Sequence, residues 1–203
     1  LARSAEGLLP PTRLVLSGVA VAAVLGAVTG FLLQVAPRAR AVRAALYWTS
    51  GGLGSAAWPA VAGTVALAAV VAFGLWRFAS ELDRMLLGEE VAASMGVEVP
   101  RVRAALLVAG AALTGAVVSL GGAIGFVGLV APHLGRMLAG STHRRLAPVA
   151  AAVGALLLLA ADTLARTAFV PRELPAGVLT AVLGGPFFLA LLRRRAYAFA
   201  EVA

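Results

Sequence analysis

Few residues of this sequence could do chemistry, and they lie within or beside long apolar segments. Asp162 and Arg166 are four residues apart, so on a helix they would share one face. A carboxylate inside an apolar segment is costly, and it marks either a functional site or one half of an ion pair. We interpret Asp162 as a member of an ion pair. For Arg166 the choice between pairing and docking of an acidic partner stays open.

The two histidines offer little support for catalysis. His133 is the only histidine within an apolar run, where it could relay protons or hydrogen-bond a carbonyl freed by Pro132. We favour the structural interpretation. His143 lies in a different segment, and cysteine is absent, so a metal site would lack ligands. Because the G-x-S-x-G, H-E-x-x-H, P-loop and dinucleotide signatures are also absent, we expect neither an enzyme nor a cofactor or metal bound by this chain.

The composition is that of a membrane protein. Hydrophobic residues make up 61% of 203 positions and charged residues 13%, whereas a soluble domain has about half and about a quarter. The net charge of +8 raises the question of nucleic acid. However, the arginines gather at the ends of apolar runs and form no basic stripe. We therefore expect a lipid bilayer as partner and no nucleic acid.

Six apolar segments must position these residues. A span needs about 20 apolar residues, and in lipid the backbone has to be helical. The Gly121-Gly122 pair and Gly125 mark the break between the third segment and a short fourth one. The predicted spans are 14–35, 58–78, 104–120, 126–138, 146–168 and 174–192.

The arginines predict the orientation. With both termini inside, twelve arginines lie on the cytoplasmic side and five outside, as the positive-inside rule requires. The polar segment 81–103 is then cytoplasmic, and its stretch MLLGEEVAASMGV predicts one or two short helices that end at Gly96. Such a segment is either a solvated face or a handle for a soluble partner, and composition alone leaves this open.

Several spaced motifs carry a family likeness. GFVGLVAPHLGRMLAGSTHRRLAP is followed by ADTLAR and ELPAGVLTAVLGGPFFLALLRRR, and LLGEEVAASMGV lies upstream. In this order they resemble the permease family of ABC importers for vitamin B12, ferric siderophores and haem, the FecCD type. The likeness extends from about residue 14 to residue 195.

The resemblance implies a fold and a set of partners. Family members have ten helices per subunit, two permease subunits, two ATPase subunits inside and a substrate-binding protein outside. This sequence resembles helices five to ten, so we expect residues 1–203 to form one partial, all-α permease domain in the bacterial cytoplasmic membrane. ATP and Mg²⁺ would be bound by the ATPase. The implied mechanism is alternating access, and the substrate would be an iron-siderophore, haem or cobalamin.

The resemblance also assigns residues. Arg166 matches the arginine that meets an acidic residue of the binding protein. The PHLGR segment is architecture, with Pro132 and His133 belonging to a turn and the short helix after it. The candidate ATPase-coupling residues are Leu86, Gly88, Glu89, Glu90, Ala92, Ala93, Met95 and Gly96. The candidate pathway-lining residues are Gly18, Gly26, Gly30, Gly177, Thr180 and Gly184.

Two other classes of protein remain as alternatives. An ion-coupled secondary transporter would use Asp162, the only acidic residue within a span, as its coupling site. An intramembrane enzyme would need a nucleophile and a base that face each other, and His133 is its best candidate.

Overall fold

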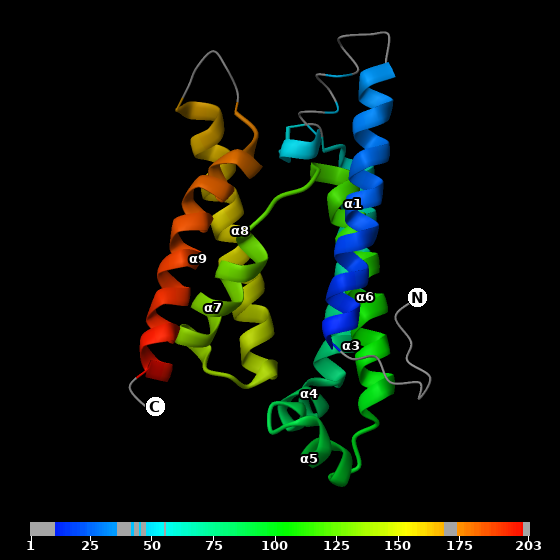
Figure 1. Ribbon diagram of the computed structural model, residues 1–203, viewed down its shortest axis with the longest axis vertical. Helices are drawn as coiled ribbons and strands as arrows, with labels where there is room; N and C mark the ends of the chain where they lie inside the picture. Colours follow the sequence, from blue (N-terminus) through cyan, green and yellow to red (C-terminus); the bar gives the residue numbers. More distant parts are fainter. Residues whose placement is uncertain are drawn as a thin grey trace.

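The computed structural model describes residues 11–35, 42, 45, 48–54, 56–168 and 174–200, and within these residues it contains helices and no strand. Four helices, α1, α3, α6 and α8, are long and apolar enough to cross a membrane, and α9 contains a shorter apolar stretch, Ala176–Leu191. The prediction of an all-α polytopic membrane protein is confirmed. The helices are α1 Pro11–Val35, α3 Trp58–Arg77, α4 Ala79–Met85, α5 Glu89–Ser94, α6 Val99–Gly121, α7 Val127–Ala139, α8 His143–Thr167 and α9 Ala176–Ala200 (Figure 1).

The helix ends differ from the predicted spans where polar residues extend a helix beyond the apolar segment. Helix α6 begins five residues early, at Val99, because Pro100 fits the first turn of a helix. Helix α8 begins at His143, ahead of the predicted residue 146. Helix α7 has 13 residues, which rise about 20 Å, so it is too short to cross a hydrocarbon core of about 30 Å.

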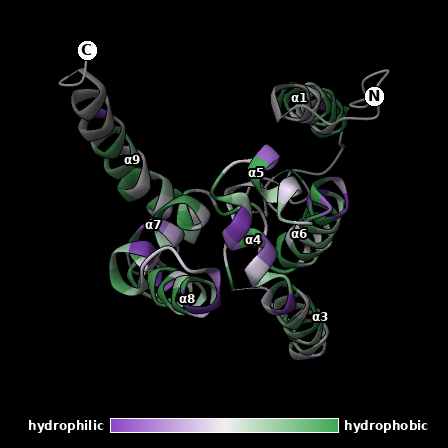
Figure 2. Cartoon of the chain, turned by 90° about the horizontal axis from the view of Figure 1, so that it is seen from below, coloured by the Kyte–Doolittle hydropathy of each residue, from purple (hydrophilic) through white to green (hydrophobic). Residues whose placement is uncertain are grey.

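The helices form two groups. Helices α7, α8 and α9 pack on one another, and α3 packs on α6. Figure 1 shows these groups side by side, with α1 on the side of α3 and α6. Seen from below, α1 stands away from the other helices (Figure 2), and none of its apolar core is buried within the chain. The large apolar side chains that this leaves exposed are suited to lipid or to further membrane helices.

Two ends of the molecule can be told apart by charge. Helices α4 and α5 lie at the lower end in Figure 1, below α3 and α6. By the positive-inside rule we take this end as cytoplasmic and call it the inner end. The described arginines at this end include Arg77, Arg84, Arg101, Arg103, Arg136, Arg144, Arg145 and Arg193.

At the opposite, outer end, the backbones of the last residue of α6, the segment before α3 and the first turn of α9 meet. The Gly52 N–H donates to the Gly121 carbonyl at 2.7 Å, and the Gly177 N–H donates to the Gly51 carbonyl at 3.0 Å. A Cβ at Gly177 would lie 1.9 Å from the Ser50 carbonyl oxygen, so glycine is required for this approach. We call this contact the glycine junction. It joins the start of α9 and the end of α6 to the chain segment that precedes α3.

Candidate coupling surface and polar contacts

Helices α4 and α5 form a small unit with its own apolar base. Four buried residues make this base, and Leu82, Met85 and Leu106 pack against it. Ala92 is fully buried there. Its small side chain lets α5 lie against the start of α6, so Ala92 is not on the exposed surface of the unit, and its part in coupling stays a prediction. The buried residues are Ala92, Val97, Val99 and Val102.

The far side of this unit carries exposed apolar side chains. Leu86 is 58% exposed, Leu87 64%, Val91 45% and Met95 48%. We call these four residues the apolar tip. They lie outside the four spans, so lipid does not explain their exposure, and exposed apolar patches mark interaction sites. Sequence reasoning identified Leu86 and Met95 but missed Leu87 and Val91, although the four-residue spacing of 87, 91 and 95 is a helix-face signal.

The charges of the unit are partly used within the chain. Glu89 pairs with Arg103 of α6, so this carboxylate, expected to meet a partner, ties α5 to α6. Glu98 pairs with Arg101, and both side chains are exposed, which makes the pair weak. Glu90 lies exposed in the first turn of α5, where a negative charge suits the helix dipole.

The remaining predicted coupling residues lie on the surface of the unit. Ala93, Gly88 and Gly96 are exposed. Gly96 has a φ of +82°, so it ends the α5 turn in a backbone conformation that side chains other than glycine rarely adopt.

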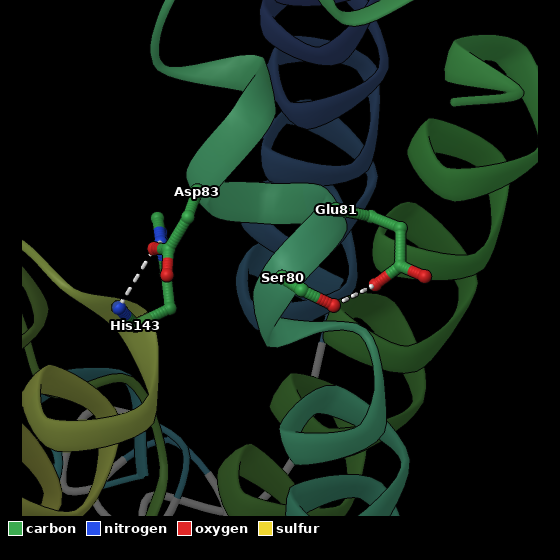
Figure 3. Close-up of polar contacts among 4 residues, drawn as sticks. All are labelled: Ser80, Glu81, Asp83 and His143. Carbon is green, nitrogen blue, oxygen red and sulfur yellow. Dashed lines mark hydrogen bonds and ion pairs between the residues drawn. The ribbon is translucent and has the colours of Figure 1, made fainter. Parts of the chain in front are cut away.

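Asp83 of α4 joins this unit to the second helix group. Its Oδ1 accepts a hydrogen bond from the backbone N–H of His143 at 2.9 Å and contacts the Nδ1 of the same residue at 2.6 Å (Figure 3). Because a carboxylate can only accept, Nδ1 carries the proton. The hydrogen bond from the His143 backbone is the main cause that lowers the pKa of Asp83, while burial acts in the opposite direction.

A second contact lies beside the first. The Arg144 guanidinium lies over the Trp76 ring, 5.3 Å from its centroid, which is a cation–π geometry. Trp76 belongs to the last turn of α3 and Arg144 to the first turn of α8. We call Asp83, His143, Arg144 and Trp76 the inner clamp, because together they hold the start of α8 against α3 and α4.

The membrane carboxylate is paired. Asp162 Oδ2 lies 2.8 Å from Arg166 Nη2 on the same face of α8, and the two side chains are 15% and 42% exposed. The interpretation of Asp162 as an ion-pair member agrees with this contact. Arg166 keeps an exposed side at the outer end of α8, so pairing does not prevent it from meeting a second carboxylate.

The predicted lining residues fall into two environments. On α1, a Cβ added at Gly18, Gly26 or Gly30 would meet nothing within 4 Å, so this face is open within the described chain. On α9, a Cβ at Gly184 would lie 2.3 Å from the Cβ of Phe126. Together with the glycine junction, this contact indicates that α9 uses its glycines to pack.

Thr180 is buried, and its hydroxyl donates to the Gly177 carbonyl at 3.0 Å within α9. An apolar cavity of about 260 Å³ lies beside it, between α7, α8 and α9. Its lining residues are Phe126, Val127, Val130, Leu134, Leu157, Ala161, Thr180, Leu183, Gly184 and Phe187.

His133 takes part in an apolar contact. Its ring meets Phe187 of α9 edge-on, with 6.2 Å between the ring centroids. Helix α7 continues through Pro132. The contact agrees with the structural interpretation of His133, with an aromatic ring as its partner in place of the carbonyl that Pro132 frees.

Comparison with known proteins identifies a family. Residues 1–194 match the FecCD transport family. The chain is 45% identical over 190 residues to the "Cobalamin import system permease protein BtuC" of Halobacterium salinarum, covering 94% of this chain and 50% of that protein. It is also 45% identical over 185 residues to the "Hemin transport system permease protein HmuU" of Yersinia pestis, covering 90% and 54%.

A solved structure shares the fold. It is described as an inward-facing conformation of a putative metal-chelate type ABC transporter, and it matches with a TM-score of 0.82 at 27% identity, covering 91% of this chain and 60% of that chain. The chain spans about half the length of the curated relatives named above.

Proposed function

This chain belongs to the FecCD transport family, and from this premise we propose that it is a permease component of an ATP-driven importer in the bacterial cytoplasmic membrane. The observation that carries the proposal is its 45% identity, over most of its length, to proteins named as permeases for cobalamin and hemin. We propose a substrate of the same chemical class, namely a corrinoid, haem or an iron-siderophore complex.

The chemistry of the importer is divided among several chains. In this proposal a separate ATPase binds ATP and Mg²⁺, a second permease subunit completes the pathway, and an extracytoplasmic binding protein delivers the substrate. ATP binding closes the ATPase and changes which side of the membrane the pathway faces. A ligand shifts such an equilibrium only by its different affinity for the two states. The present chain contributes membrane helices and a contact for the ATPase and catalyses no reaction.

The apolar tip supports the contact with the ATPase. Four exposed apolar side chains at the inner end, on two short helices with a buried base, suit a shallow groove on a soluble protein. We assign the seat to Leu86, Leu87, Val91 and Met95, with Gly88, Glu90, Ala93 and Gly96 around them. Ala92 and Glu89 position the unit from within the chain.

Arg166 supports contact with the binding protein at the other end. Its partly exposed guanidinium has five N–H donors, and the ion pair with Asp162 leaves donors for a second carboxylate. We propose that this second carboxylate belongs to the binding protein.

An ion-coupled transporter is the weaker alternative. It would need the Asp162 carboxylate to bind and release a cation during transport. Arg166 already neutralises this carboxylate at 2.8 Å, and the relatives named above are import permeases.

Reconstitution tests the proposal. The complete assembly that contains this chain is purified from native membranes through a tag and its subunits are identified by mass spectrometry. It is then placed in liposomes with cyanocobalamin, haemin or ferric citrate as the probe. We expect a co-purified ATPase and ATP-dependent accumulation of one probe. Accumulation driven by an ion gradient without ATP would contradict the proposal, as would a purified assembly that contains no ATPase.

A further inference from the structure

The inner clamp connects two parts of the molecule that the chain itself connects only distantly. Asp83 and His143 are separated by 60 residues, and their hydrogen bonds join α4 to the first residue of α8 (Figure 3). Helix α4 also carries the short connection to the apolar tip, because it ends at Met85, directly before Leu86. The clamp therefore lies immediately behind the proposed ATPase contact.

The two helix groups differ in how a movement of the apolar tip can reach them. Helices α3 and α6 continue directly into α4 and α5, so they follow any movement of the tip through the chain itself. Helix α8 has no such connection. At the inner end it is held by α4 and α3, and it packs extensively on α7 and contacts α9. A force applied to the tip therefore reaches α7, α8 and α9 at this end through the clamp.

The geometry of the clamp suits the transmission of movement. Asp83 Oδ1 receives two donors from one residue, at 2.9 and 2.6 Å, which fixes the direction of the carboxylate as well as its distance. Its negative charge lies at the N-terminus of α8, where the helix dipole favours it. Arg144 over Trp76 adds a contact to α3 that resists rotation of α8 about its own axis. At the outer end, the glycine junction ties α9 to the other helix group.

We propose that Asp83 and His143 are positioning residues for coupling, which make α8 and the helices packed on it follow the movement of the apolar tip. This inference rests on the proposed function as an ATP-driven importer. The glycine junction acts as the pivot, and the inner clamp transmits the displacement. Loss of the clamp then separates ATP hydrolysis from transport, while the contact with the ATPase at the tip is kept.

The test uses the complete assembly in liposomes, with the probe that the intact importer accumulates. Asp83→Ala removes both hydrogen bonds of the carboxylate. We expect ATP hydrolysis and ATPase binding to stay near the unmodified level, and the amount of probe transported per ATP hydrolysed to fall by at least about fivefold. Asp83→Asn keeps an oxygen that accepts from the His143 backbone, so we expect it to restore part of the ratio.

The matched control is Glu81→Ala. Glu81 lies on the same helix, and its carboxylate accepts a hydrogen bond from Ser80 within that helix (Figure 3). We expect this variant to transport as the unmodified protein does. If Asp83 had a purely structural role, Asp83→Ala would lower ATP hydrolysis and transport together, and the amount of probe transported per ATP hydrolysed would stay constant.

A second readout follows the movement directly. The chain has no cysteine, so pairs of introduced cysteines place spin labels at chosen positions, and the assembly with the unmodified chain, treated with the same label, gives the background of the other subunits. Labels at Ser94 on α5 and at Ala147 on α8, both exposed, are each paired with Val70 on α3. Because α3 continues into α4, we expect ATP to leave the Ser94 to Val70 distance constant in both proteins. The intact clamp makes α8 follow α3, so ATP should also leave the Ala147 to Val70 distance constant in the unmodified protein and should change it in Asp83→Ala. An Ala147 to Val70 distance that ATP does not change in Asp83→Ala would overturn the inference, whereas failure of the proposed function would show as a purified assembly that contains no ATPase.

Discussion

At the scale of single residues, Asp83 shows how one carboxylate can serve two donors of the same neighbour. The backbone N–H of His143 would otherwise be one of the unsatisfied donors at the start of α8. The imidazole adds a second donor, and the Arg144 charge lies nearby. These interactions favour the ionised carboxyl, which is why the pKa of Asp83 lies below its ordinary value of 3.8 despite the opposing effect of burial.

This direction predicts how the clamp depends on pH. Because the pKa of Asp83 is lower when folded than when unfolded, the contact contributes stability that is fully present above pH 3.8 and is lost as the pH falls through the folded value. The clamp should therefore persist at neutral and mildly acidic pH and open only below about pH 3.8.

The fluorescence of Trp76 measures this opening, since Arg144 lies over its ring. The measurement needs Trp48→Phe and Trp58→Phe, so that Trp76 is the remaining tryptophan. We expect a constant emission down to about pH 4 and a change below it. Asp83→Asn should remove this change, and a transition that persists in Asp83→Asn would assign it to another group.

Arg166 and Asp162 give a second prediction at this scale. If Arg166 also contacts the binding protein, Arg166→Gln should weaken binding by about fivefold, because an exposed ion pair contributes up to about 1 kcal/mol. Asp162→Asn keeps the guanidinium and serves as the matched control, with an affinity near that of the unmodified protein. The affinity of the purified permease assembly for the binding protein is the measurement. An equal loss of affinity for the binding protein in both variants would mean that Arg166 acts only by pairing with Asp162.

At the scale of elements, the unit of α4 and α5 combines a buried base with an exposed tip. The base fixes α5 against the start of α6 through Ala92, and the ion pair from Glu89 to Arg103 holds the same interface. The unit is therefore able to keep its shape while its apolar tip is exposed. This separation lets the tip be changed without unfolding the base.

Val91 tests the tip. Val91→Asp places a charge where 45% of the side chain is exposed, so it should leave the fold intact and cost about 1 kcal/mol or more in the ATPase contact, since apolar burial there is lost. We expect less ATPase to co-purify with the variant. Ser94→Asp, on the same helix and also exposed, is the control and should retain the ATPase. Full co-purification with Val91→Asp would remove the tip from the interface.

The sequence predicted these elements better than their contacts. Long apolar runs predict the bounds of a helix to within a few residues. The differences at α6 and α8 arise because the segments 99–103 and 143–145, which carry basic residues, are helical too. The short helices of the polar segment 81–103 were also predicted, while their role in coupling stays a prediction. Hydropathy could not predict that Ala92 is buried, because the apolar partners in its base come from two neighbouring segments. The clamp escaped prediction for a similar reason, since Asp83 and His143 are 60 residues apart and each is an ordinary polar residue near a helix end.

At the scale of the whole molecule, the two helix groups are tied at both ends and differ in how they are tied. The glycine junction is made of backbone atoms at close approach, with Gly177 too near Ser50 to accept a side chain. The inner clamp is made of side chains that can separate and reform. Closely packed backbone cannot shift easily, so the glycine junction suits a pivot. The hydrogen bonds and the cation–π contact of the inner clamp suit the transmission of movement between helices. In this arrangement α7, α8 and α9 move as one unit.

The apolar cavity between α7, α8 and α9 tests this rigid unit. Ala161 of α8 is buried at its wall, and the space of about 260 Å³ is large enough for a leucine side chain. Ala161→Leu should therefore stabilise the purified protein by up to about 1 kcal/mol, because the three added carbon atoms gain packing contacts in the cavity but are not removed from water between membrane helices. If the three helices move together, the cavity keeps its shape during transport and the variant should transport normally. Thermal unfolding in detergent and uptake in liposomes measure the two quantities. A variant that is more stable but transports poorly would mean that the helices around the cavity repack against one another in each transport cycle. In that case α7, α8 and α9 would not move as one unit.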